Sequence, residues 1–225
     1  MIPIADNNPT RRLPVVTWAL LFACIGVFVW QLNLGTGGFQ MAVHQYGLIP
    51  AALFNAPLGH PELALAPVAT VFTSMFLHGG LLHLAGNMLF LYVFANNIED
   101  SMGHGRFLLF YVVCGAAAAL TQGLLAPDSG VPMVGASGAI SGVLGAYLVL
   151  HPFAWVKLLV PYFVIFFVWL PAWLMLGLWF GFQLLQSMLT PADQAGVAFG
   201  AHAGGFVAGM VLIPFFRRRG VPLFR

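Results

Sequence analysis

Charged side chains are scarce in this sequence. Lysine, arginine, aspartate and glutamate together make up 6% of its 225 residues, against roughly 25% in an ordinary soluble domain. Hydrophobic residues make up 60% of the chain, so the charges are too few to cover the surface of a soluble globule. The composition therefore indicates a protein that faces lipid. The net charge of +2 gives no indication of a nucleic-acid partner.

Cysteines and metal-binding patterns are also scarce. The two cysteines, Cys24 and Cys114, both lie inside apolar tracts, and we interpret them as small buried hydrophobic residues rather than a disulfide. The chain has no His-Glu-x-x-His pattern, and the histidines of the apolar tracts have no carboxylate in the same tract at the same depth. The sequence therefore predicts no metal site.

Long uncharged tracts occupy most of the chain. A hydrocarbon core about 30 Å thick needs roughly 20 apolar residues in a helix, and each span must be helical because lipid cannot bond the backbone. Six tracts qualify: 13–34, the C-terminal two-thirds of 67–98, 107–126, 133–150, the part of 158–189 after Pro161 or Pro171, and 195–216. The predicted fold class is all-α, with residues 1–225 forming one membrane domain of six helices, an N-terminal tail (1–12) and a basic C-terminal tail (217–225).

The basic residues predict the orientation. With six helices, all eight fall on one side of the membrane: Arg11, Arg12, Arg106, Lys157, Arg217, Arg218, Arg219 and Arg225. The opposite loops contain Glu62, Asp128 and Asp193 and no lysine or arginine. The positive-inside rule therefore predicts that both termini are cytoplasmic. The long apolar connection 35–67 belongs to the outer side, and we expect it to lie in or on the outer leaflet.

A few polar residues lie inside these tracts, where they are costly and become functional candidates. His83 and Asn87 are spaced i, i+4 and share a helix face. Ser137 and His202 each follow an outer loop closely, so all four side chains are expected at one depth in the outer third of the membrane. His78 is about one turn further out. Four other polar residues can satisfy themselves locally and are not candidates: Thr17, Thr121, Gln122 and Gln183.

Small residues recur beside two of these candidates. Ser137, Ser141 and Gly145 are spaced four residues apart, and so are Ala201, Gly205 and Gly209. Such stripes allow two membrane helices to approach closely. Close approach of the fourth and sixth helices would bring Ser137 to His202.

Together these groups suit acyl transfer. A serine becomes a nucleophile when a histidine takes its proton, and the oxyanion that forms needs hydrogen-bond donors already in place. His83, Asn87 and the backbone N–H groups near Ser137 could supply them, in a Ser–His dyad without a carboxylate. From the residues alone, a transporter or channel with a histidine-lined path remains an alternative.

Four motifs carry a resemblance to a known family. They are His78-Gly79-Gly80-Leu81-Leu82-His83-Leu84-Ala85-Gly86-Asn87-Met88, Glu99-Asp100 with Gly103-His104-Gly105-Arg106-Phe107, Gly135-Ala136-Ser137-Gly138, and Ala201-His202-Ala203-Gly204-Gly205. Over about residues 65–215 the chain resembles the bacterial rhomboid intramembrane serine proteases. The resemblance implies a multi-pass protein of the bacterial inner membrane, with no metal and no organic cofactor.

The resemblance also implies roles for the matched residues. Ser137 would be the nucleophile and His202 the base, and His83 and Asn87 would form the oxyanion hole. His78, Gly135 and Gly138 would be accessory residues. The substrate would be a single-pass membrane protein, cut within or near its transmembrane segment. It would enter laterally past the fifth helix, with a possible gate formed by Phe163, Phe166, Phe167 and Trp169. The sequence gives no indication of oligomeric state.

One departure from the family concerns the base. Some members place an aromatic residue one turn after the nucleophile, against the histidine ring, and here that residue is Ser141. The His202 ring must then be held by another group. A catalytically inactive relative that binds membrane clients is a further alternative, although such relatives typically lack the serine or the histidine.

Overall fold

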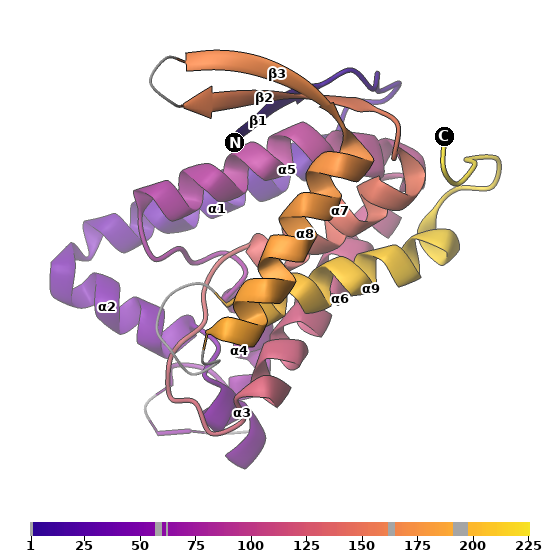
Figure 1. Cartoon of the computed structure of the whole chain (residues 1–225). Helices are drawn as coiled ribbons and strands as arrows, with labels where there is room; N and C mark the ends of the chain where they lie inside the picture. The colour runs from indigo at the N-terminus through magenta and orange to yellow at the C-terminus, as the bar shows by residue number, and fades with distance from the viewer. Residues whose placement is uncertain (1, 57–59, 62, 162–164, 191–197) are drawn as a thin grey trace.

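The computed structural model describes residues 2–56, 60–61, 63–161, 165–190 and 198–225 (Figure 1). Glu62, Phe163 and Asp193, named above, lie outside these ranges. The long helices are α1 (Val15–Asn33), α5 (Leu81–Met102), α6 (His104–Leu125), α7 (Ser137–Leu150), α8 (Ala172–Leu189) and α9 (Phe199–Phe216). The long connection after α1 contains three shorter ones: α2 (Gly35–Tyr46), α3 (Pro50–Asn55) and α4 (Pro67–Thr73).

Within the described residues, five helices are long and apolar enough to cross a membrane: α1, α5, α6, α8 and α9. The predicted polytopic helical bundle is therefore confirmed. The fourth predicted span corresponds to α7, which has 14 residues, or about 21 Å at 1.5 Å per residue. That is shorter than the hydrocarbon core, so helix length alone does not confirm the count of six spans. The cytoplasmic placement of both termini also stays a prediction.

The short helix α7 packs directly against α9. Nearly all side chains of α7 are buried. A methyl group added at Gly205 of α9 would collide with the backbone carbonyl of Gly138, and one at Gly209 would collide with that of Gly142. The two backbones are therefore in contact, as the small-residue stripes predicted, and only glycine fits at these crossing points.

A three-stranded antiparallel sheet accompanies the bundle and was not predicted. Its order is β1 (Ile2–Asp6), β2 (Trp155–Pro161) and β3 (Ile165–Pro171), and Figure 1 shows it lying across one end of α8. Val156 and Leu158 of β2 are fully buried whereas Trp155 is exposed, the alternation of a strand with one covered face. The strand is only seven residues long, and one of its partners is distant in the sequence, so the sequence assigns the apolar residues around it to membrane helices.

The sheet corrects the prediction of an aromatic gate. Phe166, Phe167 and Trp169 lie on β3 and not on the fifth membrane helix. The helix itself, α8, begins at Ala172 immediately after Pro171. This start confirms that the fifth span follows one of the two prolines, in line with the preference of proline for a helix start.

Both predicted tails are tied to the bundle. The N-terminal tail contributes β1, which pairs with β2, and the C-terminal tail donates the N–H of Phe224 to the Val149 carbonyl at 2.9 Å. Beside them the buried carboxylate of Glu99 accepts the backbone N–H groups of Val16 at 2.9 Å and Thr17 at 2.8 Å. An anion at the N-terminus of α1 satisfies donors that the helix leaves free, which fixes α1 against α5.

Candidate active site

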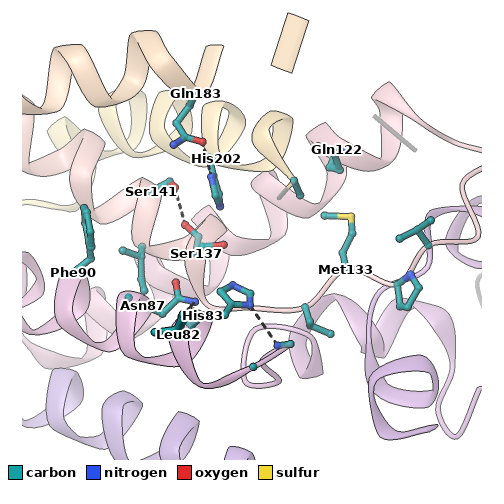
Figure 2. A pocket seen from close by; sticks show the side chains of 18 of the residues that line it. Leu82, His83, Asn87, Phe90, Gln122, Met133, Ser137, Ser141, Gln183 and His202 are labelled. Carbon is teal, nitrogen blue, oxygen red and sulfur yellow. Dashed lines mark hydrogen bonds between the residues drawn. The ribbon is translucent and has the colours of Figure 1, made fainter. Parts of the chain in front are cut away.

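A cavity of about 850 Å³ lies between α5, α7, α8 and α9. Its lining includes all four residues that the sequence singled out for catalysis: His83, Asn87, Ser137 and His202 (Figure 2). They come from three helices that are far apart in sequence. Gln183, which was not predicted to belong to the site, also lines the cavity.

Ser137 is the first residue of α7 and follows a glycine in an unusual conformation. Gly135 has a φ of +126°, a region that L side chains rarely adopt. A Cβ on Gly135 would lie 2.7 Å from Nε2 of His83 and 3.6 Å from Oγ of Ser137. Glycine at this position therefore lets the chain pass between the nucleophile candidate and the His83 ring. The accessory position predicted for Gly135 thus has a steric basis.

Backbone donors surround Ser137. The first hydrogen bond of this helix end runs from the N–H of Ile140 to the carbonyl of Ala136 at 3.0 Å. The N–H groups of Ser137 and Gly138 therefore precede the helical ladder and point out of the helix end. Gly138 also packs tightly, because a Cβ there would lie 2.7 Å from Cβ of Ala118.

His202 lies in the first turn of α9 and is held from α8. Its Nδ1 is 2.8 Å from Oε1 of Gln183, and its ring lies 6.0 Å from the Trp179 ring at an interplanar angle of 31°. Figure 2 shows the imidazole between Gln183 and Ser137. In the described chain no hydrogen bond joins Ser137 to His202; such bonds are often long before substrate binds.

His83 and Asn87 lie on the opposite side of Ser137, on α5. The N–H of Gly79 approaches Nδ1 of His83 at 3.4 Å, so this nitrogen acts as the acceptor and the proton belongs on Nε2, near Ser137. Asn87 donates one Nδ2 hydrogen to the carbonyl of His83 at 3.0 Å. Its second Nδ2 hydrogen remains available to the cavity.

His78 supports His83 from outside the cavity. Its side chain is fully buried, its ring lies 5.3 Å from the ring of His83, and its backbone N–H and carbonyl are both bonded by the Gln31 amide at 3.0 and 3.2 Å. Burial, and then the neighbouring His83, lowers the pKa of His78 to about 4. Because its pKa is lowered, the buried His78 ring is neutral, and a neutral ring can pack against the ring of His83.

The arrangement offers three kinds of group for one reaction: a serine hydroxyl, an imidazole oriented by an amide, and N–H donors from α5 and α7. Among the residues that the structure describes, no three His, Cys, Asp or Glu side chains are grouped so that they could hold a metal ion. The groups present are those of nucleophilic acyl transfer. Gln183 was not among the predicted site residues, because an amide in an apolar tract can satisfy itself locally and its contact with His202 exists only once α8 packs against α9.

Comparison with known proteins identifies the family. The chain is 42% identical over 76 residues to Rhomboid protease GluP of Bacillus subtilis, covering 34% of this chain and 14% of that protein. It is 30% identical over 183 residues to RHOMBOID-like protein 1 of Arabidopsis thaliana, covering 80% and 43%. It is 36% identical over 78 residues to Inactive rhomboid protein 1 of Drosophila melanogaster, covering 35% and 5%.

These matches span less than half the length of each relative. The family model described as the Rhomboid domain matches residues 66–219, close to the stretch 65–215 over which the motifs resemble that family. The match extends over more than half of the chain, and the chain therefore belongs to the rhomboid family.

Proposed function

We propose that this protein is an intramembrane serine endopeptidase that uses Ser137 as the nucleophile and His202 as the general base. The observation that carries the proposal is the position of Ser137. It lies between the His202 imidazole on one side and the His83 ring on the other, at the wall of a single cavity. Membership of the rhomboid family supports the same chemistry.

The first step forms an acyl-enzyme. Oγ of Ser137 attacks the carbonyl carbon of a peptide bond while its proton passes to Nε2 of His202. The tetrahedral intermediate collapses, the C–N bond breaks, and His202 gives the proton to the departing amine. A water molecule, deprotonated by the same imidazole, then attacks the ester; the C–O bond breaks, His202 returns the proton to Oγ of Ser137, and the second product leaves as a carboxylic acid.

Negative charge on the carbonyl oxygen is stabilised by donors that are already in place. His83 and Asn87 line the same cavity as Ser137 and have an Nε2–H and an Nδ2 hydrogen left to donate, and the N–H groups of Ser137 and Gly138 lie at the end of α7. Preorganised donors of this kind are worth about 3–4 kcal/mol each in known serine proteases. The four therefore form the proposed oxyanion hole.

The substrate is a transmembrane protein, cut within or near its membrane-spanning segment. The cavity opens among helices that are long and apolar enough to span a bilayer, so a substrate segment can reach it laterally. The least buried of these spans is α8, with 22% of its apolar window covered. The position of α8 makes it the element past which a substrate helix would enter. The resemblance of its motifs to those of bacterial rhomboid proteases supports a location in a bacterial inner membrane.

The test is a cleavage assay with purified protein and a transmembrane substrate, with a fluorophosphonate probe that labels activated serine. Wild type is expected to cleave and to be labelled, and Ser137→Ala and His202→Ala to do neither. Ser187→Ala on α8 is the matched serine control. Cleavage by Ser137→Ala would refute the mechanism. Binding of the transmembrane segment without cleavage or labelling would instead support an inactive client-binding protein.

A further inference from the structure

The helix α8 holds the imidazole of His202 through two side chains one turn apart. Gln183 is 7% exposed, and its Oε1 meets Nδ1 of the ring at 2.8 Å. Trp179, four residues earlier, lies alongside the ring and also contacts Phe206 of α9, with ring centres 6.0 Å apart. The contact with Trp179 fixes the plane of the His202 ring. The hydrogen bond to Gln183 fixes its rotation within that plane.

The hydrogen bond to Gln183 also selects the tautomer. An amide oxygen can only accept, so Nδ1 of His202 must carry the proton. Nε2 then keeps its lone pair, and Figure 2 shows the opposite end of the ring turned toward Ser137. This is the tautomer that a general base for Ser137 requires, since the other tautomer would present a proton to the hydroxyl.

The residue one turn after the nucleophile does not perform this task. The Ser141 side chain is buried, and its hydroxyl donates to the backbone carbonyl of Ser137 at 2.7 Å. Its hydroxyl is therefore committed to its own helix. Gln183 supplies the contact to the ring from a different helix.

We propose that Gln183 is a positioning residue that fixes the orientation and tautomer of His202; the proposal rests on the protease function proposed above. The Gln183 amide is uncharged, so it orients the His202 ring without placing a charge beside it. His83 of α5 is the other titratable group among the described residues that line the cavity. His202 is therefore oriented by an uncharged side chain on α8, the least buried of the spans. The orientation of its ring depends on α8 staying packed against α9.

Three variants, Gln183→Met, Gln186→Met and Gln183→Glu, test whether Gln183 contributes to the rate of catalysis. Gln183→Met keeps the volume and removes the acceptor, and kcat is expected to fall about 10- to 100-fold, the range for groups that orient a functional histidine, while KM changes less than about twofold. Gln186→Met makes the same change on α8 outside the cavity lining, and kcat is expected to stay at the wild-type value.

Gln183→Glu restores an acceptor but adds a charge. A carboxylate beside Nδ1 favours the protonated ring, so the acid limb of the pH–rate profile is expected to move to higher pH while alkaline activity is retained. A merely structural role for Gln183 would change stability and leave this profile where it is. Wild-type kcat in Gln183→Met with an unmoved profile in Gln183→Glu would overturn the proposal.

A spectroscopic measurement separates this inference from the protease function itself. Nitrogen-15 signals of histidine-labelled protein, with His202 assigned by its replacement, report which ring nitrogen carries the proton. The wild type is expected to show the Nδ1–H form and Gln183→Met a mixture of tautomers. An unchanged tautomer would sink the inference even in an active enzyme. If the wild type neither cleaves nor labels, the protease proposal fails and the tautomer still decides the role of Gln183.

Discussion

The contact between α7 and α9 makes a quantitative prediction about glycine. A methyl group at Gly209 would collide with the carbonyl of Gly142, and backbone cannot move aside as a flexible side chain can. Overpacking of this kind costs about 1–3 kcal/mol. The substitution also gains up to about 1 kcal/mol because alanine favours a helix more than glycine does. The clash is expected to prevail, and Gly209→Ala should be less stable than wild type.

The matched control is Gly181→Ala on α8, where nothing lies within 4 Å of an added Cβ. Only the helix-propensity gain acts there, so this variant should be as stable as wild type or slightly more so. Thermal unfolding in one detergent ranks the three proteins. Because α9 carries His202 and α7 carries Ser137, Gly209→Ala should also label more slowly with fluorophosphonate. Equal melting temperatures and labelling rates for Gly209→Ala and wild type would refute the backbone-contact argument.

Three further predictions concern other parts of the molecule. Glu99→Ala leaves the N–H groups of Val16 and Thr17 without their acceptor, and the loss should exceed about 2 kcal/mol in unfolding experiments; the same stability in the variant would contradict a capping role. Burial raises the pKa of Asp6 to about 6, so the folded state binds its proton more tightly than the unfolded chain. Stability from this group should fall as pH rises from about 4 to 6 and stay low above, and Asp6→Asn should remove that dependence in melting curves. Metal chelators should leave cleavage by the wild type unchanged, because every proposed step uses side-chain and backbone groups; inhibition that added zinc reverses would argue against the mechanism.

The polytopic helical bundle and the residues that line one cavity could both be predicted from the sequence, whereas the sheet and the partner of His202 could not. Polar groups are rare in apolar tracts, so Ser137, His202, His83 and Asn87 could be selected as candidates, and the structure brings all four to one cavity. The contact of α7 with α9 followed from Gly205 and Gly209. Helical periodicity and loop length sufficed for these inferences because each inference concerns a single helix or one pair of helices.

The predictions that were wrong or missing required information from more than one segment. The sequence assigns Leu158 to an apolar tract and Val156 to a loop, and their role as the buried face of a strand depends on pairing with β3 and with β1 at the other end of the chain. Gln183 could satisfy itself locally on α8, and nothing in its own tract indicates that His202 lies 2.8 Å away. Partners that exist only after helices pack cannot be identified from the tract that contains them.

The small side chain at position 141 also bears on why the base is held from α8. The hydroxyl of Ser141 is used within α7, and no ring at this position reaches His202. Ser141 lines the same cavity as His202, Gln183 and Trp179, so an aromatic residue at position 141 would occupy part of that cavity. The contacts to the His202 ring come instead from Gln183 and Trp179 of α8. The small residue at 141 and the amide at 183 are thus consistent parts of one arrangement, and the loss of kcat caused by Gln183→Met should be smaller when Ser141 is also changed to an aromatic residue that packs against the ring.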